Sequence, residues 1–211
     1  MKPIIIIGSG GQCKSAIDVI ESTKLYEILG ILDHESKIGE SINGYKIIGT
    51  DNDIDKYIES GFSFHIGVGQ IKNSLTRENI FNSLKSKHAD LPSIIAHTAY
   101  VSNNAHIKEG SIIHHKAFVN SNVIIGHNCI INTSAIIEHD CFVDSNCHIS
   151  TNATINGNCS INRNSFIGSN SVVSNGVCVE AFNIIGAGSV IISNTLPNSI
   201  YVGNPARKIN N

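Results

Sequence analysis

Residues 125–191 read IGHNCI INTSAI IEHDCF VDSNCH ISTNAT INGNCS INRNSF IGSNSV VSNGVC VEAFNI IGAGSV I when they are divided into units of six. Every unit begins with Ile or Val, and the same spacing reaches back to Ile95, so 17 consecutive positions are aliphatic. The fifth residue of a unit is small, and the residue before it is Asn or Gly in 11 of 16 units. Asn and Gly tolerate the positive φ that tight corners require. A repeat of this regularity predicts a solenoid.

One aliphatic residue, one small residue and one corner in each unit indicate a triangular coil of three units. The aliphatic side chain points inward and stacks on its copy 18 residues later, with parallel strands ~4.8 Å apart. Cysteine occupies the small inward position in four units, where it acts as a small hydrophobe rather than a nucleophile. These residues are Cys129, Cys141, Cys147 and Cys159.

The first part of the chain follows a different pattern. A buried strand at Ile4–Ile7 precedes the loop Gly8-Ser9-Gly10-Gly11, a helix over 12–21 and a second strand over 28–32 that ends at Asp33. This order predicts a small Rossmann-like βαβ domain over residues 1–90, followed by the coil domain over 91–211. The Gly loop could hold an anion or simply form a turn, since Cys13 replaces the third glycine of the dinucleotide fingerprint.

Composition narrows the classes of function. The net charge is −2 and Lys and Arg are not clustered, which excludes a nucleic-acid-binding surface. The longest unbroken aliphatic run, Ile4–Ile7, is far shorter than the ~20 apolar residues of a membrane span. The N-terminus lacks the features of a secretory signal, so we expect a cytoplasmic protein with reduced cysteines, no membrane and no nucleic-acid partner.

The segment Asn132 to Asp140 places a histidine between two carboxylates in the middle of the coils. His139 lies near a corner and points outward, where Asp140 can hold one tautomer and make the ring more basic. The alternative is an exposed histidine in a polar corner. His148 follows nine residues later, which is half a coil, so the two rings can meet only between two prisms.

A metal site is not expected. His97 and His115 are 18 residues apart and stack on adjacent coils, with His114 nearby, but no third ligand of suitable geometry is indicated.

Five stretches together resemble one family along nearly the whole chain. They are Ile7-Gly8-Ser9-Gly10-Gly11, Leu32-Asp33, Asn132 to Asp140, Gly186-Ala187-Gly188 and Gly203-Asn204-Pro205-Ala206. They are similar to those of the nucleotide-amino-sugar acetyltransferases typified by the bacillosamine-pathway enzyme, which group with the sialic acid O-acetyltransferases. The resemblance implies a left-handed parallel β-helix, acetyl-CoA as co-substrate, and a homotrimer with its sites between adjacent coils of neighbouring chains.

The same resemblance assigns roles to individual positions. It implies that His139 is the general base and that Asp140, where the bacillosamine enzyme has Glu, raises its basicity. It places acetyl-CoA at His148, Ser169 and Ala187. It places the nucleotide-sugar at Gly10, Gly11, Gln12, Asp33, His34 and Gly69. Gln12-Cys13 stands where the family usually has His-Gly, which changes the expected contact with the diphosphate.

The sequence therefore predicts an N-acetyltransferase that moves acetyl from acetyl-CoA to the amine of a UDP- or dTDP-linked amino-deoxy sugar for surface glycan assembly. The attack is direct, without an acyl-enzyme. One alternative is an O-acetyltransferase that acts on sialic acid or a related nonulosonate. Another is a non-catalytic hexapeptide scaffold. A prism of the carbonic anhydrase type would need a three-histidine zinc site, which the sequence does not indicate.

Overall fold

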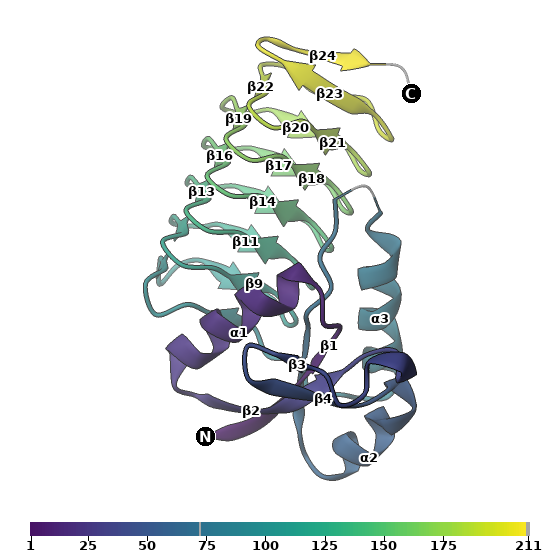
Figure 1. The fold of residues 1–211 in the computed structure, drawn as a ribbon. Coiled ribbons are helices and arrows are strands. Elements are labelled where there is room, and N and C mark those ends of the chain that lie inside the picture. Colours follow the sequence, from purple (N-terminus) through teal and green to yellow (C-terminus); the bar gives the residue numbers. More distant parts are fainter. Residues whose placement is uncertain (72, 210–211) are drawn as a thin grey trace.

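The structure is a computed structural model that describes residues 1–71 and 73–209. A small mixed α/β part lies at the base, and the rest of the chain winds upward from it as a triangular prism (Figure 1). This is the predicted fold class, a Rossmann-like part followed by a left-handed parallel β-helix.

A five-stranded sheet in the order β3-β4-β2-β1-β5 forms the base, and only its β3–β4 pair is antiparallel. Its strands are β1 (Lys2–Ile7), β2 (Tyr26–Leu32), β3 (Ser41–Ile42), β4 (Tyr45–Gly49) and β5 (Ser63–Ile66). Its helices are α1 (Gly11–Thr23), α2 (Ile54–Glu59) and α3 (Leu75–Ser86), with 3₁₀ turns η1 (Glu35–Lys37) and η2 (Asp51–Asp53). The predicted strands and helices are present, whereas β3, β4 and α2 were not predicted.

Three parallel sheets form the faces of the prism. Face 1 contains β7 (Tyr100–Val101), β10 (Phe118–Val119), β13 (Ile136–Ile137), β16 (Thr154–Ile155), β19 (Val172–Val173) and β22 (Val190–Ile191). Face 2 contains β8 (His106–Ile107), β11 (Ile124–Ile125), β14 (Phe142–Val143), β17 (Ser160–Ile161) and β20 (Cys178–Val179). Face 3 contains β6 (Ile94–Ile95), β9 (Ile112–Ile113), β12 (Ile130–Ile131), β15 (His148–Ile149), β18 (Phe166–Ile167) and β21 (Ile184–Ile185), and ends with the hairpin β23 (Ile200–Gly203) and β24 (Ala206–Ile209).

The corners adopt the backbone conformation that the Asn and Gly pattern indicates. Every sixth residue from Gly110 to Gly188 has a positive φ of 56° to 74°. Most are Asn or Gly, but the same conformation also falls on Lys116, Ser134, Asp140 and Phe182. The geometry of the coil therefore fixes these corners even where the residue type does not favour them.

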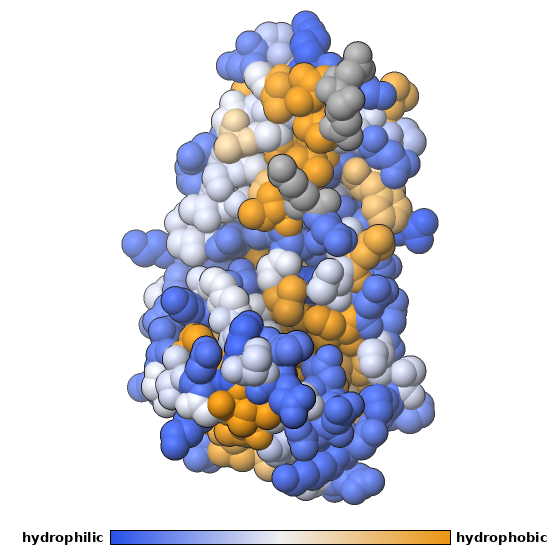
Figure 2. Space-filling model, turned by 45° about the vertical axis from the view of Figure 1, so that its right-hand side comes forward, coloured by the Kyte–Doolittle hydropathy of each residue, from blue (hydrophilic) through white to orange (hydrophobic). Residues whose placement is uncertain are grey.

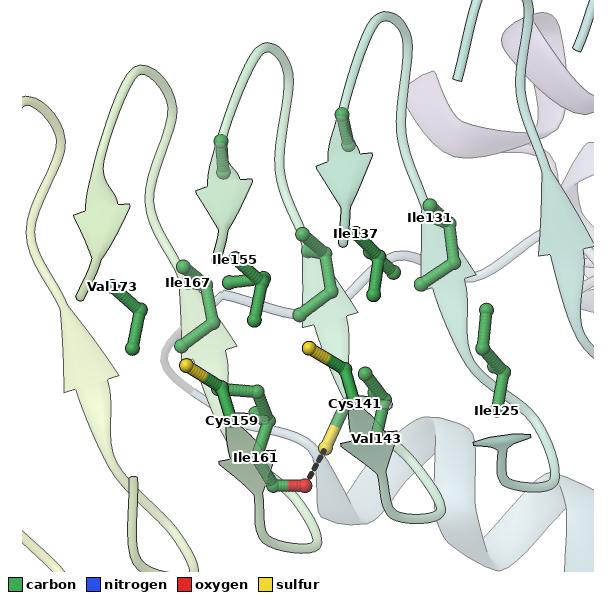
Figure 3. Packing of buried hydrophobic residues seen from close by; sticks show 14 of the residues in the cluster. Ile125, Ile131, Ile137, Cys141, Val143, Ile155, Cys159, Ile161, Ile167 and Val173 are labelled. Carbon is green, nitrogen blue, oxygen red and sulfur yellow. Dashed lines mark hydrogen bonds between the residues drawn. The ribbon is translucent and has the colours of Figure 1, made fainter. Parts of the chain in front are cut away.

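The inside of the prism is filled by the repeating aliphatic and small residues. The repeating Ile and Val residues are fully buried from Ile113 to Ile185, and Ile137, Ile155 and Val173 stack from coil to coil on face 1 (Figure 3). The Sγ of Cys141 donates to the carbonyl of Asn156 one coil above, and burial raises the pKa of the Cys129 thiol to about 12. Cysteine therefore serves here as core filling.

Asn183 is the one exception at the small position, and the end of the solenoid explains it. This side chain is fully buried, and its Oδ1 accepts from the amide of Ser199 at 2.8 Å. Its amide group donates to Thr195 Oγ1. The Asn183 side chain thus provides a hydrogen-bond partner for a backbone amide at the point where the chain leaves the regular coils for β23. This interaction caps the end of the solenoid.

Helix α1 packs between the N-terminal sheet and the first coils. Its buried residues share one apolar cluster with Ile4, Ile31, Ile94 and Ile112. On the α3 side, the fully buried Arg77 donates to the carbonyls of Val68 at 2.8 Å and Asn128 at 3.2 Å. Burial lowers the pKa of this guanidinium to about 10. Arg77 therefore ties the segment after β5 to the coils, and the two parts form one packed unit.

The outer surface alternates between polar and apolar patches along the whole length of the molecule (Figure 2). Tyr100, Ile124 and Phe142 are exposed on faces 1 and 2, and Tyr100 stacks on Phe118 with ring centroids 5.0 Å apart. None of the helices within the described residues is long and apolar enough to cross a bilayer.

Candidate active site

His139 and Asp140 lie at the edge between faces 1 and 2, in the turn that joins β13 to β14. The His139 Nδ1 is 2.8 Å from Asp140 Oδ2, and the two side chains are 52% and 45% exposed. Hydrogen bonds from Asn122 and then from His139 lower the pKa of the Asp140 carboxyl. An ionised carboxylate only accepts, so the His139 Nδ1 carries the proton and donates it, while Nε2 keeps a free lone pair.

Gly157 lies directly above the His139 ring, one coil along the same edge. A Cβ placed on Gly157 would come within 2.7 Å of both Cε1 and Nε2 of His139. The equivalent positions on the other coils carry side chains, as at Asn103, Ser121 and Asn175. Glycine leaves the space that the imidazole occupies. Sequence analysis missed Gly157, although the residues spaced 18 apart from it on the same edge all carry side chains.

His148 begins β15 on face 3 and is buried beneath the segment that follows β5, with a relative exposure of 6%. The carbonyl of Gln70 is 2.7 Å from its Nδ1, and the amide nitrogen of Asn132 is 3.3 Å from its Nε2. Because the carbonyl can only accept and the amide donates, the ring is the neutral Nδ1–H tautomer. Burial lowers the pKa of His148 to about 4. The N-terminal part therefore covers the ring, so His148 is already buried within its own chain.

Ser169 and Ala187 occupy consecutive coils on the edge between faces 3 and 1. The amide of Gly188 donates to the carbonyl of Ser169 at 2.8 Å, which stacks these two corners. Ser169 Oγ is 2.9 Å from Ser150 Oγ on the coil below. Ala187 is exposed. This edge runs upward from the level of His148, so the three residues lie along one side of the prism, whereas His139 lies on a different edge.

Asp33 closes the Gly loop of the N-terminal part. Its Oδ2 accepts from the amide of Ser9 at 2.7 Å and from the Ser9 hydroxyl, and Lys37 Nζ is 3.1 Å from its Oδ1. Burial raises the pKa of this carboxyl, but the hydrogen bonds from Ser9, His34 and Lys37 outweigh it and lower the pKa to about 2. Sequence analysis missed Ser9 and Lys37 as its partners, because their positions around Asp33 follow from the geometry of the loop and of η1.

A cleft of about 430 Å³ opens beside this loop. Asp33, His34 and Gly8 of the Gly loop line it, and so do Thr50 and Asn52, which sequence analysis did not single out. Gly8 has φ +92°, and a Cβ there would meet Val68 Cγ2 at 2.5 Å, so only glycine fits this turn.

Gly10, Gly11 and Gln12 lie at the start of α1, outside the lining of that cleft, and so does Gly69, in the segment that follows β5. A Cβ on Gly10 or Gly11 would meet no atom within 4 Å, so their backbone is open to a ligand. Gly69 packs on the Gln12 Cβ, which a Cβ of its own would approach to 3.4 Å. The Gln12 Nε2 donates to the Nε2 of the buried His114 at 3.0 Å. Gln12 thus connects the Gly loop to the edge between faces 3 and 1 of the prism, close to His148.

Within residues 1–71 and 73–209, no group of three or more His, Cys, Asp or Glu side chains has the geometry to hold a metal ion. His97 and His115 do lie against each other, with ring centroids 5.9 Å apart, but His115 Nε2 pairs with Asp18 at 3.0 Å.

Comparisons with known proteins support the resemblance. Residues 3–84 match the family described as the PglD N-terminal domain, and no curated protein matches the sequence. The acetyltransferase domain of PglB from Neisseria gonorrhoeae, in complex with acetyl coenzyme A, is 30% identical with a TM-score of 0.92, over 99% of each chain. PerB from Caulobacter crescentus, in complex with CoA and GDP-perosamine, is 25% identical with a TM-score of 0.91, over 100% of this chain and 98% of that chain. WeeI from Acinetobacter baumannii shares the fold at 20% identity and TM-score 0.85, over 99% of this chain and 100% of that chain.

Three buried imidazoles make the stability of this region sensitive to acid. Burial, followed by neighbouring positive charges, lowers the pKa of His114 to about 4 and that of His65 well below 6.5. Burial also lowers the pKa of His148 to about 4. The unfolded chain therefore binds more protons than the folded chain between about pH 4 and pH 6.5, and stability falls as the pH falls through this window. The rings of His114 and His148, with a pKa of about 4, each contribute up to about 3 kcal/mol to this loss.

We expect His114→Gln to reduce the difference in unfolding free energy between pH 7 and pH 4.5, measured by urea titration. The exposed His106→Gln serves as the control and should leave that difference as in the wild type. An undiminished acid loss in His114→Gln would show that its neutral state is not what acid removes.

Proposed function

We propose the following acceptor for this chain, which belongs to the hexapeptide-repeat family of acetyl-CoA-dependent sugar N-acetyltransferases. The acceptor is the amine of an amino-deoxy sugar linked to UDP or dTDP. Two observations support a nucleotide-linked acceptor. PerB is bound to CoA together with GDP-perosamine. This chain has a cleft of about 430 Å³ beside its Gly loop. The GDP-perosamine N-acetyltransferase of Caulobacter crescentus is named for transfer to an amine, which favours an amine over the hydroxyl of a nonulosonate.

The observation that carries the catalytic proposal is the pair formed by His139 and Asp140. With Nδ1–H held by the carboxylate at 2.8 Å, the free Nε2 of a half-exposed ring is available to an incoming amine. In the proposed step the amine nitrogen attacks the thioester carbon and His139 Nε2 takes its proton. Collapse then breaks the C–S bond, and the same proton passes to the CoA sulfur. Asp140 fixes the tautomer and stabilises the imidazolium.

Acetyl-CoA is proposed to bind along the edge between faces 3 and 1, with contacts at His148, Ser169 and Ala187. The neutral His148 ring, fixed by Gln70 and Asn132, offers no charge to a neutral thioester arm. The cysteines nearest to His139 are buried inside the prism, so they do not compete as acyl carriers.

The nucleotide-sugar is proposed to bind at Gly10, Gly11, Gln12, Asp33, His34 and Gly69. The open backbone at the start of α1 suits the diphosphate, since a helix N-terminus attracts anions. Asp33 and His34 face the cleft beside this helix and are suited to the nucleoside. With the Asp33 carboxylate held by Ser9 and Lys37, it acts as a fixed acceptor for a hydroxyl or an N–H of the ligand.

The complete site is proposed to form between two copies of the chain in a homotrimer. His139 lies on the edge between faces 1 and 2, whereas His148, Ser169 and the N-terminal part lie around face 3. One chain therefore presents the base to one neighbour and the substrate sites to the other. The exposed Tyr100, Ile124 and Phe142 supply apolar surface for such packing.

Release of free thiol from acetyl-CoA, measured with UDP-, dTDP- and GDP-linked amino sugars and with free sialic acid, tests the acceptor. We expect turnover with a nucleotide-linked amino sugar, and loss of about 10²–10⁴-fold in His139→Asn because general base catalysis is removed. Turnover with sialic acid alone, or an unchanged rate in His139→Asn, would refute this assignment.

Gly157→Ala should displace the His139 ring and lower kcat on the order of 10²-fold, because the added methyl occupies the space of Cε1 and Nε2. Ser121→Ala, one coil below His139 on the same edge, is the control and should keep the wild-type rate. A crystal structure of Gly157→Ala checks the cause. An active variant with its ring in place would mean that Gly157 does not position His139.

Mixing two inactive variants tests the shared site. His139→Asn and Gly11→Trp are each expected to be inactive, the second because its indole fills the open start of α1. Subunits that exchange after mild unfolding should regain part of the activity, because some interfaces then join an intact base to an intact substrate site. No recovery in demonstrably mixed oligomers, or a monomer by sedimentation, would contradict the intersubunit site.

A further inference from the structure

His139 has a carboxylate on each side in the sequence, and an asparagine from the coil below donates to each of them. Asn120 Nδ2 lies 2.6 Å from Glu138 Oε2, and Asn122 Nδ2 lies 3.0 Å from Asp140 Oδ1. An ionised carboxylate only accepts, so both amide groups donate. The two pairs differ in how they relate to the rest of the coil, and this difference separates a structural pair from one that can serve His139.

The pair of Asn120 and Glu138 has a counterpart on an edge where no reaction is proposed. On the edge between faces 2 and 3, Asn162 Nδ2 donates to Glu180 Oε2 at 3.1 Å from the same positions of the six-residue unit. The residue that follows Glu180 is Ala181, so no imidazole uses this carboxylate. An asparagine beneath a glutamate at this position is therefore a feature of the coil itself.

Asparagines at the left-handed corners also form pairs between adjacent coils. Asn128 Nδ2 donates to Asn146 Oδ1 at 2.8 Å on the edge between faces 2 and 3. Asn152 Nδ2 donates to Asn170 Oδ1 at 2.7 Å on the edge between faces 3 and 1. All four corners have φ between 56° and 59°, so the same backbone conformation brings each pair of side chains together. In both pairs the donor and the acceptor are neutral amides.

The corner pair on the edge that carries His139 has an acid as its acceptor. Asn122 and Asp140 both have φ 59°, and the amide of Asp140 donates to the carbonyl of Ser121 at 3.0 Å. The stacked backbones therefore hold these two side chains in the same register as the amide pairs. Of the three corner pairs, this one has an acceptor that also contacts a histidine, so a structural pair becomes a support for His139.

The two oxygens of Asp140 have separate partners. Oδ1 accepts from Asn122, whereas Oδ2 lies 2.8 Å from His139 Nδ1. The terminal torsion of an aspartate is broad, so a carboxylate held through one oxygen can rotate. A second hydrogen bond from a corner of fixed height opposes this rotation and keeps Oδ2 toward the ring. The hydrogen bond from Asn122 is also the first cause of the lowered pKa of this carboxyl, so it favours the ionised form.

We infer that Asn122 is a positioning residue, which orients the Asp140 carboxylate and through it the His139 ring. This inference rests on the proposed role of His139 and Asp140 in catalysis. Rotation of the carboxylate would release Nδ1–H, and the ring could then turn, so that Nε2 would point toward the amine in a smaller fraction of the molecules. Asn122 therefore acts on kcat and not on the binding of either substrate.

The test measures kcat and both KM values for wild type, Asn122→Gly, Asp140→Asn and the double variant. Glycine tolerates the corner conformation and removes only the amide group, and asparagine holds the same corner elsewhere, as at Asn170. We expect Asn122→Gly to lower kcat about tenfold, as for loss of one hydrogen bond to a charged group, with both KM values unchanged. The double variant should equal Asp140→Asn alone, because Asn122 acts through that carboxylate.

Asn158→Gly is the matched control. Asn158 is exposed at the corner one coil above Asp140 on the same edge, with φ 60°, so the variant removes the same group from the same type of corner. It should keep the wild-type kcat. An equal loss in Asn158→Gly would assign the effect to a looser corner and overturn the inference. An unchanged kcat in Asn122→Gly, or losses that multiply in the double variant, would also overturn it.

Asp140→Asn separates this inference from the proposed function. A wild-type rate in Asp140→Asn would remove the carboxylate from catalysis and overturn both proposals. A loss in Asp140→Asn without a loss in Asn122→Gly would overturn the role of Asn122 alone. Urea titration of each variant measures its unfolding free energy, so that kcat is compared between folded proteins.

Discussion

The inward stack of aliphatic side chains is the constraint on which the rest of the structure depends. Ile or Val recurs every sixth residue, is buried within the coils, and sets adjacent strands one hydrogen-bonded spacing apart. Because the stack must stay in register, each corner from Gly110 to Gly188 is forced to the left-handed conformation, even at Lys116, Ser134 and Phe182. The coil thereby becomes a rigid lattice on which an outward side chain at a given position has a fixed height and edge. His139, Gly157, Ser169 and Ala187 are positions on this lattice.

Much of this lattice was predictable because its period is local. The six-residue repeat, the corners, the buried cysteines and the outward position of the His139-Asp140 pair follow from spacing alone. The helix α1 and the strands β1 and β2 were predicted from apolar runs beside glycines. The short β3–β4 hairpin and α2 were not, because their few apolar residues, such as Ile42 and Ile47, give no repeated pattern.

The contacts between the two parts of the chain could not be predicted from the sequence. His148 appears in the sequence as an outward residue of a coil, and only the packing of the segment around Gln70 buries it. His114 likewise contacts Gln12, 102 residues away, and its pKa is lowered by burial beneath the N-terminal part. Arg77 contacts carbonyls from both parts and pairs with no carboxylate within residues 1–71 and 73–209, so charge pairing gives no clue to it. Such contacts depend on tertiary packing, which the local repeat does not encode.

The left-handed corner at Asp140 has a consequence for how this edge of the prism can change during evolution. Its φ of 59° is tolerated by Asp, Asn and Gly, and strongly disfavours β-branched residues whatever their chemistry. Under the proposed role of His139 as base, the carboxylate beside it is subject to two independent selections, one from the backbone and one from the imidazole. Drift to Asn would retain the turn and lose the charge, so a descendant could become a well-folded pseudoenzyme by a single conservative step.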